Sequence, residues 1–281
     1  MIATVADLRR LTDAARADGG RIGFVPTMGA FHDGHRSLIE RARREADVLV
    51  VSIFVNPLQF SDPRDLETYP RSEDRDVGDA ERLHVDLLFA PTEREMYPAG
   101  RPVVTVDPGP MGDRLEGASR PGHFRGVATV VAKLFIAVGS CRAYFGEKDA
   151  QQLAIVRWMV ADLGVPVDVV TCPTVREPDG LAMSSRNVLL DPADREAAGC
   201  LFLALSEAAE RARSGERDAA ALVAVMAREI GATPRAVLVY AAVVDDATFE
   251  EIRTIERPAR ALVAARFGDV RLIDNLLLPI A

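Results

Sequence analysis

The run Val48–Val55 constrains the fold more than any other stretch of this sequence. It reads Val-Leu-Val-Val-Ser-Ile-Phe-Val, rich in β-branched residues and almost free of polar interruptions. A strand that is covered on both faces of a parallel sheet has this uninterrupted apolar pattern. We therefore expect a parallel sheet with helices on both of its faces.

The segments on either side of this run alternate between strand and helix patterns. Periodicity predicts helices over residues 4–18, 35–46, 72–83, 127–138 and 149–163, and strands over 21–25, 48–55, 86–91, 142–145 and 167–171, with a short extra strand at 103–106. Alternation of this kind predicts an α/β fold: a Rossmann-like, doubly wound parallel sheet with right-handed crossovers.

The pattern changes in the last third of the chain. Residues 190–213 and 218–230 are rich in Ala, Glu and Arg at helical spacing, and strand-like segments follow at 237–244, 261–267 and 270–278. Helices followed by strands, without alternation, predict a smaller C-terminal α+β lid domain. We place the two domains at 1–174 and 175–281.

Composition narrows the partners that the chain can have. Its 281 residues are 48% hydrophobic, enough for a full core, and the net charge of -8 argues against nucleic-acid binding. Three cysteines that lie far apart fit free thiols in a reducing compartment better than disulfides. Neither a secretory signal nor an apolar run long enough to cross a bilayer is evident. We expect a cytoplasmic protein without membrane partners.

The turn Pro26–His35 is the first candidate for chemistry. It joins an apolar strand pattern to a helix pattern and contains two glycines and two histidines, His32 and His35. Free backbone N–H groups and the positive end of a helix dipole make such a turn suitable for a phosphate group. An ordinary turn and a zinc site are the alternatives, but the four histidines and scattered cysteines lack the close pairs of a zinc ligand set.

Polar residues also follow the other expected strands. Asn56–Phe60 follows the second strand, Gly146–Asp149 the fourth, and Met183–Asn187 lies beyond the fifth. Ligands bind at the carboxyl ends of parallel strands, so we expect these groups to form one pocket. Individually, Asn56, Asp149 and the serines can equally be capping residues.

These motifs resemble the pantothenate synthetases, or pantoate–β-alanine ligases. The segments that carry the resemblance are Pro26–His35, Ser52–Phe60, Gly122–Val127, Phe145–Asp149 and Met183–Asn187. They occur in order and with the right spacing over about residues 20–190, and the C-terminal third matches mainly in length and pattern. The His-x-Gly-His motif alone would indicate only the wider nucleotidylyltransferase superfamily. Phe31 stands where leucine is more usual.

The resemblance implies a two-step ligation. The carboxylate of (R)-pantoate attacks the α-phosphate of ATP to give pantoyl adenylate and pyrophosphate, and the amine of β-alanine then displaces AMP. It further implies Mg²⁺ and a homodimer, and we expect a dimer contact on strand 48–54.

The resemblance also assigns roles to individual residues. His32, His35 and Lys148 are implied to be catalytic, with His35 the usual proton donor. The residues implied to bind ATP are Met28, Gly29, His32, His35, Gly146, Glu147, Lys148, Asp149, Val175, Met183, Ser184, Ser185 and Arg186. Asn56, Gln59 and Gln152 are implied to bind pantoate or β-alanine, and Asp149 to bind Mg²⁺ or the ribose.

Some alternatives stay open at this point. Residues 111–125 can form a mobile flap near pantoate, or Arg120 and Arg125 can be structural ion-pair partners, and His123 has no assigned role. A synthase that keeps the nucleotide on its product and a non-catalytic nucleotide-binding module are rival functions. A dehydrogenase is weaker, because the first turn lacks Gly-x-Gly-x-x-Gly.

Overall fold

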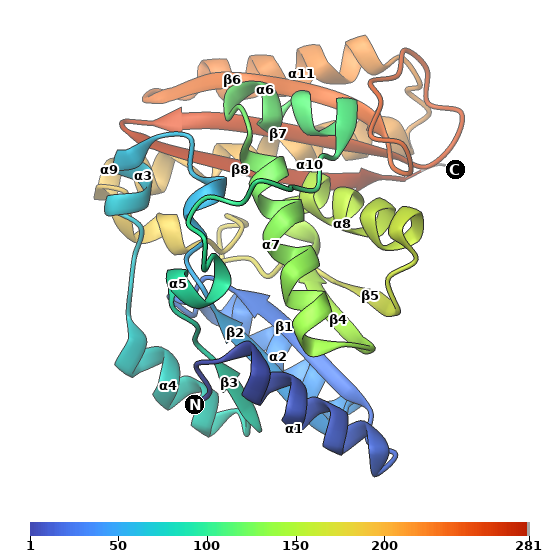
Figure 1. The fold of residues 1–281 in the computed structure, drawn as a ribbon. Helices are drawn as coiled ribbons and strands as arrows, with labels where there is room; N and C mark the ends of the chain where they lie inside the picture. Colours follow the sequence, from blue (N-terminus) through green and yellow to red (C-terminus); the bar gives the residue numbers. More distant parts are fainter. Residues whose placement is uncertain (280–281) are drawn as a thin grey trace. The chain divides into compact units, whose positions relative to one another are not determined.

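The computed structural model describes residues 1–279, and the chain forms two compact units (Figure 1). The first unit comprises Met1–Glu147 and Gln151–Pro173, and the second comprises Lys148–Ala150 and the described residues from Thr174 onward. The division that we expected between residues 174 and 175 stays a prediction about independently folding domains.

The first unit is built on a five-stranded parallel sheet in the order β3-β2-β1-β4-β5. Its strands are β1 (Ile22–Thr27), β2 (Val48–Ile53), β3 (Leu87–Phe89), β4 (Cys141–Gly146) and β5 (Val167–Cys172). Phe24 of β1 pairs with Val50 on one side and Ala143 on the other. The strand order reverses between β1 and β4, which is where a doubly wound sheet opens a crevice for ligands.

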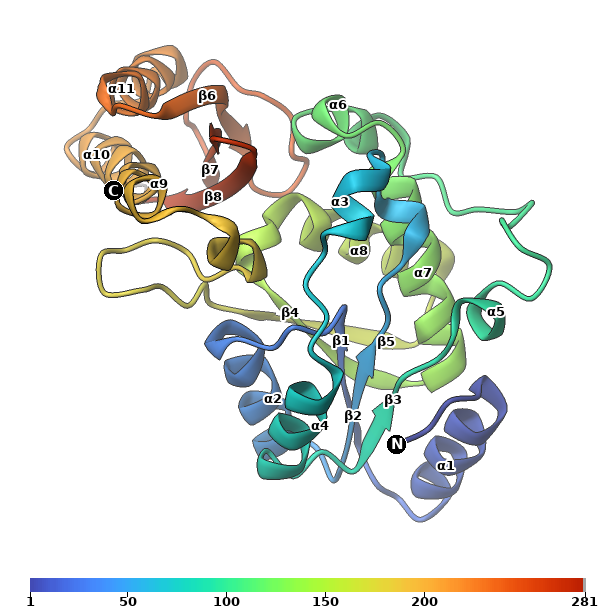
Figure 2. The same cartoon turned by 90° about the vertical axis from the view of Figure 1, so that its left-hand side faces the viewer.

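Helices cover both faces of this sheet, as the apolar run predicted (Figure 2). Phe24 and Val50 belong to one core cluster, to which α1 (Val5–Ala17), α7 (His123–Val138) and α8 (Ala150–Leu163) contribute. The opposite cluster receives side chains from α2 (Asp33–Glu45) and α4 (Glu73–Arg82). The predicted fold class is confirmed.

The central strand β2 leaves no room for the dimer contact expected on it. Its two edges pair with β1 and β3, and Leu49, Val50 and Val51 are fully buried within this chain. That placement of the contact is therefore wrong, whereas the homodimer itself stays a prediction.

The expected strand at 103–106 is also wrong. Val103 and Val104 are 99% and 85% exposed, and the N–H of Val106 donates to Thr129 Oγ1 at 3.0 Å instead of to a neighbouring strand. Prolines at 102 and 108 flank the segment and limit backbone pairing. The first unit also contains short elements that we did not expect. These are the α-helices α3 (Pro63–Glu67), α5 (Glu93–Met96) and α6 (Glu116–Ser119), and the 3₁₀ helices, labelled η, η1 (Pro57–Gln59) and η2 (Gly109–Asp113).

The second unit has the predicted order of helices followed by strands. Its antiparallel sheet β6-β7-β8 packs against α10 and α11 through a separate apolar core. The expected helix 190–213 is broken at Ala198–Gly199, where glycine weakens a helix. The elements are η4 (Ser185–Leu189), α9 (Pro192–Ala197), α10 (Cys200–Arg213), α11 (Ala219–Ala232), β6 (Ala236–Asp245), β7 (Ala259–Phe267) and β8 (Val270–Leu278).

The cysteines are buried free thiols, as expected. Desolvation raises the pKa of Cys141 to about 12, so this thiol stays protonated.

Within residues 1–279, no helix is both long enough and apolar enough to cross a membrane.

Candidate active site

The histidine turn is shorter than the sequence indicated, because β1 runs to Thr27 and α2 begins at Asp33. His32 is the N-cap of α2, and its Nδ1 accepts a hydrogen bond from the Gly34 N–H at 3.1 Å. His35 lies in the first turn of the helix and not ahead of it. Both imidazoles are therefore at the positive end of the α2 dipole, which favours an anionic ligand.

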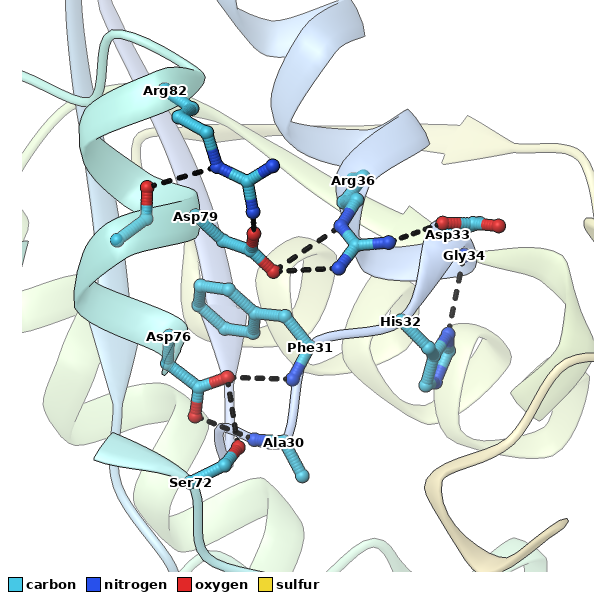
Figure 3. A network of polar contacts seen from close by, with 11 residues as sticks. Ala30, Phe31, His32, Asp33, Gly34, Arg36, Ser72, Asp76, Asp79 and Arg82 are labelled. Carbon is cyan, nitrogen blue, oxygen red and sulfur yellow. Dashed lines mark hydrogen bonds and ion pairs between the residues drawn. The ribbon is translucent and has the colours of Figure 1, made fainter. Parts of the chain in front are cut away.

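Asp76 holds the turn from the neighbouring helix α4 (Figure 3). Its carboxylate is 1% exposed and accepts hydrogen bonds from the N–H of Ala30 at 2.7 Å and of Phe31 at 2.8 Å. The Ser72 hydroxyl adds a contact at 3.2 Å. These backbone donors are consequently not free for a phosphate, contrary to our expectation for this turn.

The conformation of the turn explains why this support is needed. Ala30 has a φ of 52°, a left-handed geometry that costs an L-residue about 1 kcal/mol or more. Gly29 has a φ of 81°, and a Cβ there would lie 2.9 Å from Asp76 Oδ2. A larger residue at position 29 would therefore crowd the Asp76 carboxylate that holds the turn.

A second carboxylate ties α2 to α4. Asp79 is buried and accepts from Arg36 Nη2 at 2.8 Å, and Arg82 also pairs with it (Figure 3). Arg36 additionally bonds Asp33 in the first turn of α2. The helix that carries the histidines is thus held at its N-terminal end by ion pairs.

The two histidine rings lie against each other, with centroids 4.1 Å apart and planes tilted by 37°. In a neutral His32 whose Nδ1 accepts the Gly34 bond, the proton is on Nε2, which makes that nitrogen a donor. Two imidazoles at a helix N-terminus can stabilise negative charge that develops on a phosphate. Whether His35 transfers a proton stays a prediction.

The structure brings together three predicted site residues from the ends of β1 and β2. Gln59 Nε2 lies 3.0 Å from the sulfur of Met28, and Asn56 Nδ2 donates to Gln59 Oε1 at 3.1 Å. Asn56 is buried, and its other hydrogen bonds also go to protein groups. These bonds argue against direct substrate contact by Asn56.

The two glutamines at the start of α8 have different surroundings. Gln151 is buried, and its amide bonds the backbone of Met111, Arg114 and Glu116. This side chain therefore holds the preceding loop in place. Gln152 is half-buried and remains the candidate for a substrate contact.

In the second unit, the predicted ATP-binding residues Val175 and Met183–Arg186 lie on a loop whose two ends are joined by backbone hydrogen bonds. The N–H of Met183 donates to the carbonyl of Val175 at 3.0 Å, and Arg176 bridges to Ala182. Ser184 caps η4 through a hydrogen bond from the Arg186 N–H at 3.3 Å, which confirms the capping alternative for this serine. Ser185 and Arg186 follow within η4 and are half-buried.

Lys148 lies in η3 (Glu147–Asp149), directly after Gly146 at the end of β4. Its Nζ is 3.5 Å from the Asp149 carboxylate, and its side chain is 20% exposed. Its backbone carbonyl accepts a hydrogen bond from Asn275 Nδ2 at 2.8 Å. A residue of the C-terminal strand β8 therefore supports the lysine.

Asn275 belongs to a buried charged network in the second unit. Asp274 pairs with Arg176 at 2.6 Å and accepts from the Asn275 N–H, while Arg260 donates to Asn275 Oδ1 at 2.6 Å. The guanidinium of Arg176 also lies over the ring of Phe202, 4.3 Å from its centroid. Sequence reasoning missed this network, although a polar Asp-Asn pair inside an apolar strand was a signal for it.

The side chains that could coordinate a metal ion are relevant to the predicted magnesium site. Among residues 1–279 there is no group of three or more His, Cys, Asp or Glu side chains that could hold a metal. The zinc alternative for His32 and His35 therefore lacks a ligand set there. Asp149, 49% exposed, offers a single carboxylate, which suits Mg²⁺ because this ion takes most of its ligands from water and phosphate oxygens.

The segment around His123 has structural partners. Arg120 pairs with Asp65 at 3.1 Å and Arg125 with Asp107 at 2.6 Å, which confirms the ion-pair interpretation of both arginines. His123 is buried, and its Nδ1 lies 2.7 Å from the backbone carbonyl of Gln59. A mobile flap stays a prediction.

Comparisons with known proteins identify the family of this chain. The family described as Pantoate-beta-alanine ligase matches residues 1–277. The pantothenate synthetase of Roseiflexus sp. (strain RS-1) is 51% identical over 278 residues, which cover 99% of each chain.

Solved structures give the same result. Pantothenate synthetase from Thermus thermophilus has a TM-score of 0.91 and 48% identity, covering 99% of this chain and 98% of that one. Pantoate-beta-alanine ligase from Francisella tularensis, complexed with "Beta-gamma ATP and Beta-alanine", has a TM-score of 0.79 and 35% identity, covering 99% and 97%. The chain described here therefore belongs to the pantoate–β-alanine ligase family, the pantothenate synthetases.

Proposed function

We propose that this ligase joins (R)-pantoate to β-alanine through a pantoyl adenylate. In the first step, a carboxylate oxygen of pantoate bonds to the α-phosphorus of ATP and pyrophosphate leaves. In the second, the β-alanine amine attacks the acyl carbon, loses a proton and displaces AMP. A carboxylate is a poor acylating group, and adenylation supplies the leaving group that amide formation needs.

The observation that carries this proposal is the pair of imidazoles at the N-terminus of α2, with ring centroids 4.1 Å apart. We assign His32 and His35 to the ATP phosphates, where their N–H groups offset the charge that grows at phosphorus. Met28 and Gly29 lie before them in the turn and allow the nucleotide to approach the backbone. The buried carboxylate of Asp76 supports the assignment, because it keeps the turn in one conformation before the nucleotide arrives.

The second set of phosphate-binding residues is assigned to the segments after β4 and β5. Lys148 acts as a compact positive charge, and Arg186 offers a planar fork of donors to phosphate oxygens. Gly146, Glu147, Val175, Met183, Ser184 and Ser185 complete the assigned nucleotide contacts. Asp149 would contribute its carboxylate to Mg²⁺, which neutralises phosphate charge when bound.

We assign the acid substrate to Gln59 and Gln152. Neutral amides can bond the hydroxyl and carboxylate oxygens of pantoate without competing for its charge. Asn56 contributes to this site through Gln59, since its own hydrogen bonds are made within the protein.

Two further assignments concern the state of the protein. We propose a homodimer, supported by the resemblance to the family and testable by sedimentation equilibrium at several concentrations. We also assign the enzyme to the cytoplasm, and the three buried free thiols support a reducing compartment.

The decisive experiment is isotope exchange between labelled pyrophosphate and ATP. We expect exchange that requires pantoate and Mg²⁺ but not β-alanine, because the first step is reversible on its own. Addition of β-alanine should then release AMP and pantothenate in equal amounts. Absence of pantoate-dependent exchange in folded protein would refute the adenylation step, and a stable dinucleotide product would identify a nucleotidyl transferase instead.

A further inference from the structure

The amide of Asn56 has only one orientation that its neighbours permit. The backbone N–H of Leu58 can only donate and lies 3.3 Å from Oδ1, while the carbonyl of Gly126 can only accept and lies 3.1 Å from Nδ2. Because a reversed amide would oppose like groups at both contacts, Oδ1 must face Leu58 and Nδ2 must face Gly126.

This orientation determines the orientation of Gln59. The second hydrogen of Asn56 Nδ2 points to the Gln59 amide at 3.1 Å, so the Gln59 atom there must be the acceptor Oε1. Nε2 is then the other end of the Gln59 amide, next to the weak acceptor Met28 Sδ at 3.0 Å. The end of the Gln59 amide that faces away from Asn56 is consequently a hydrogen-bond donor.

Tyr97 completes the set of bonds to Asn56. Its hydroxyl lies 2.7 Å from Asn56 Oδ1, and the tyrosine is 5% exposed. Burial raises the pKa of Tyr97 above its ordinary value, so the hydroxyl keeps its proton and donates. Tyr97 directly follows α5, far from Asn56 in sequence, and packs against the Phe54 ring with centroids 6.0 Å apart.

The backbone of Gln59 is held as firmly as its side chain. The Gln59 carbonyl can only accept, so His123 Nδ1, 2.7 Å away, carries a proton and donates to it. His123 is itself buried at the start of α7. Gln59 is therefore restrained at its main chain and at both ends of its amide, and the second hydrogen of Nε2 remains for a substrate.

We propose that Tyr97 and Asn56 are positioning residues that orient the Gln59 amide with its N–H groups toward the acid substrate. This inference rests on the proposed function, in which Gln59 binds pantoate. The site then favours a substrate with a hydrogen-bond acceptor, such as a carboxylate or hydroxyl oxygen, at the position that contacts the Gln59 N–H groups. A substrate that presents only a donor at that position is excluded.

The test is a double-mutant cycle that measures pantoate-dependent exchange. We expect Asn56→Ala to lower kcat/KM for pantoate by about tenfold or more, mainly through KM, with KM for ATP within about twofold of wild type. If Asn56 acts only through Gln59, the same change in a Gln59→Ala background should cost less than about threefold. An equal loss in both backgrounds would overturn the inference, and so would a parallel rise in KM for ATP.

A less disruptive substitution keeps the inference testable if the Asn56→Ala variant does not fold. Tyr97→Phe keeps the packed ring and removes only the hydroxyl, and we expect KM for pantoate to rise about threefold to tenfold. The matched control is Tyr144→Phe, a fully buried tyrosine whose hydroxyl bonds Glu45 at 3.1 Å, for which KM for pantoate should not change. Equal effects of the two tyrosine variants would contradict the positioning role of Tyr97.

The results separate this inference from the proposed function. A wild-type protein that shows no pantoate-dependent exchange would refute the function itself. Wild-type exchange that depends on Gln59, combined with additive effects of Asn56→Ala and Gln59→Ala, would refute only the positioning of the amide.

Discussion

The two regions that carry the proposed phosphate-binding residues are held in place by different kinds of interaction. In the first unit, the carboxylate of Asp76 accepts two backbone N–H groups of the histidine turn. In the second unit, Lys148 is supported by Asn275, which adjoins the buried ion pair between Arg176 and Asp274. One support is a charge solvated by backbone dipoles, and the other is a network of opposite charges.

This difference in the kind of interaction determines which groups lose their partners when the supporting carboxylate is removed. Loss of the Asp76 carboxylate leaves two neutral N–H groups without their acceptor. Phe31 is buried, whereas Ala30 is half-buried and its N–H can bond water, so we expect a cost of about 1–3 kcal/mol, that of one buried unsatisfied group. Loss of Asp274 leaves the guanidinium of Arg176 without its carboxylate, at a cost of about 3–5 kcal/mol for the broken pair. Removing a carboxylate that accepts backbone N–H groups is therefore expected to lower the free energy of unfolding less than removing one partner of a buried ion pair.

The largest effects are expected at the two residues, one in each region, that we propose to be catalytic. His35→Ala and Lys148→Ala should each lower the rate of pantoate-dependent exchange by about 10²- to 10³-fold, as for the loss of other donors to a developing charge. His84→Asn changes an exposed histidine elsewhere and should leave the rate unchanged. Turnover like that of wild type in either alanine variant would refute the role given to that residue.

The next effect concerns the ion pair. Asp274→Ala should lower the free energy of unfolding by about 3–5 kcal/mol, measured by urea denaturation with a probe in the second unit. Replacing both partners, with Arg176→Met and Asp274→Leu, should recover most of that loss because no buried charge remains unpaired. A single variant as stable as wild type would show that the comparison between the regions is wrong.

A smaller loss of stability but a specific loss of rate is expected at Asp76. Asp76→Ala should cost about 1–3 kcal/mol in unfolding and about tenfold in kcat, because the turn no longer holds its histidines. Asp74→Ala, which removes an exposed carboxylate from the same helical turn, is the matched control and should change neither quantity. Equal behaviour of the two variants would exclude a positioning role for Asp76.

The smallest effect lies at the surface of the second unit. The side chain of Arg195 bonds Asp179 at 2.5 Å and holds the pKa of that carboxyl below its usual range, with both side chains partly exposed. Arg195→Ala should cost about 0.2–1 kcal/mol at neutral pH.

The sign of the pH dependence follows from the lowered pKa. The pair stabilises the folded state above the unfolded pKa of Asp179, about 3.9, and this stabilisation is lost as pH falls through the lower folded pKa. The difference in melting temperature between Arg195→Ala and wild type should therefore shrink in acid. A difference that grows as pH falls would contradict the pairing.

The sequence by itself determined the features that depend on local pattern. An uninterrupted apolar run predicts a strand covered on both faces, and strand and helix periods predict their own segments. The chain also carried its motifs at strand ends, so His32, His35, Gln59 and Lys148 could be named before any contact was known. Val103–Val106 failed because a short β-branched run does not show whether it has a partner strand.

Only the tertiary structure decided which groups these residues face. Asp76 is one of several acids in its helical turn, yet it is the one whose carboxylate bonds the backbone of the histidine turn, 45 and 46 residues away. Asn275 meets Lys148 across 127 residues, and Tyr97 meets Asn56 across 41. Hydrogen bonds depend on the positions of single atoms, which local periodicity does not encode. For this reason the side chains that we propose to act on the substrates could be predicted from the sequence, whereas those that hold them in place could not.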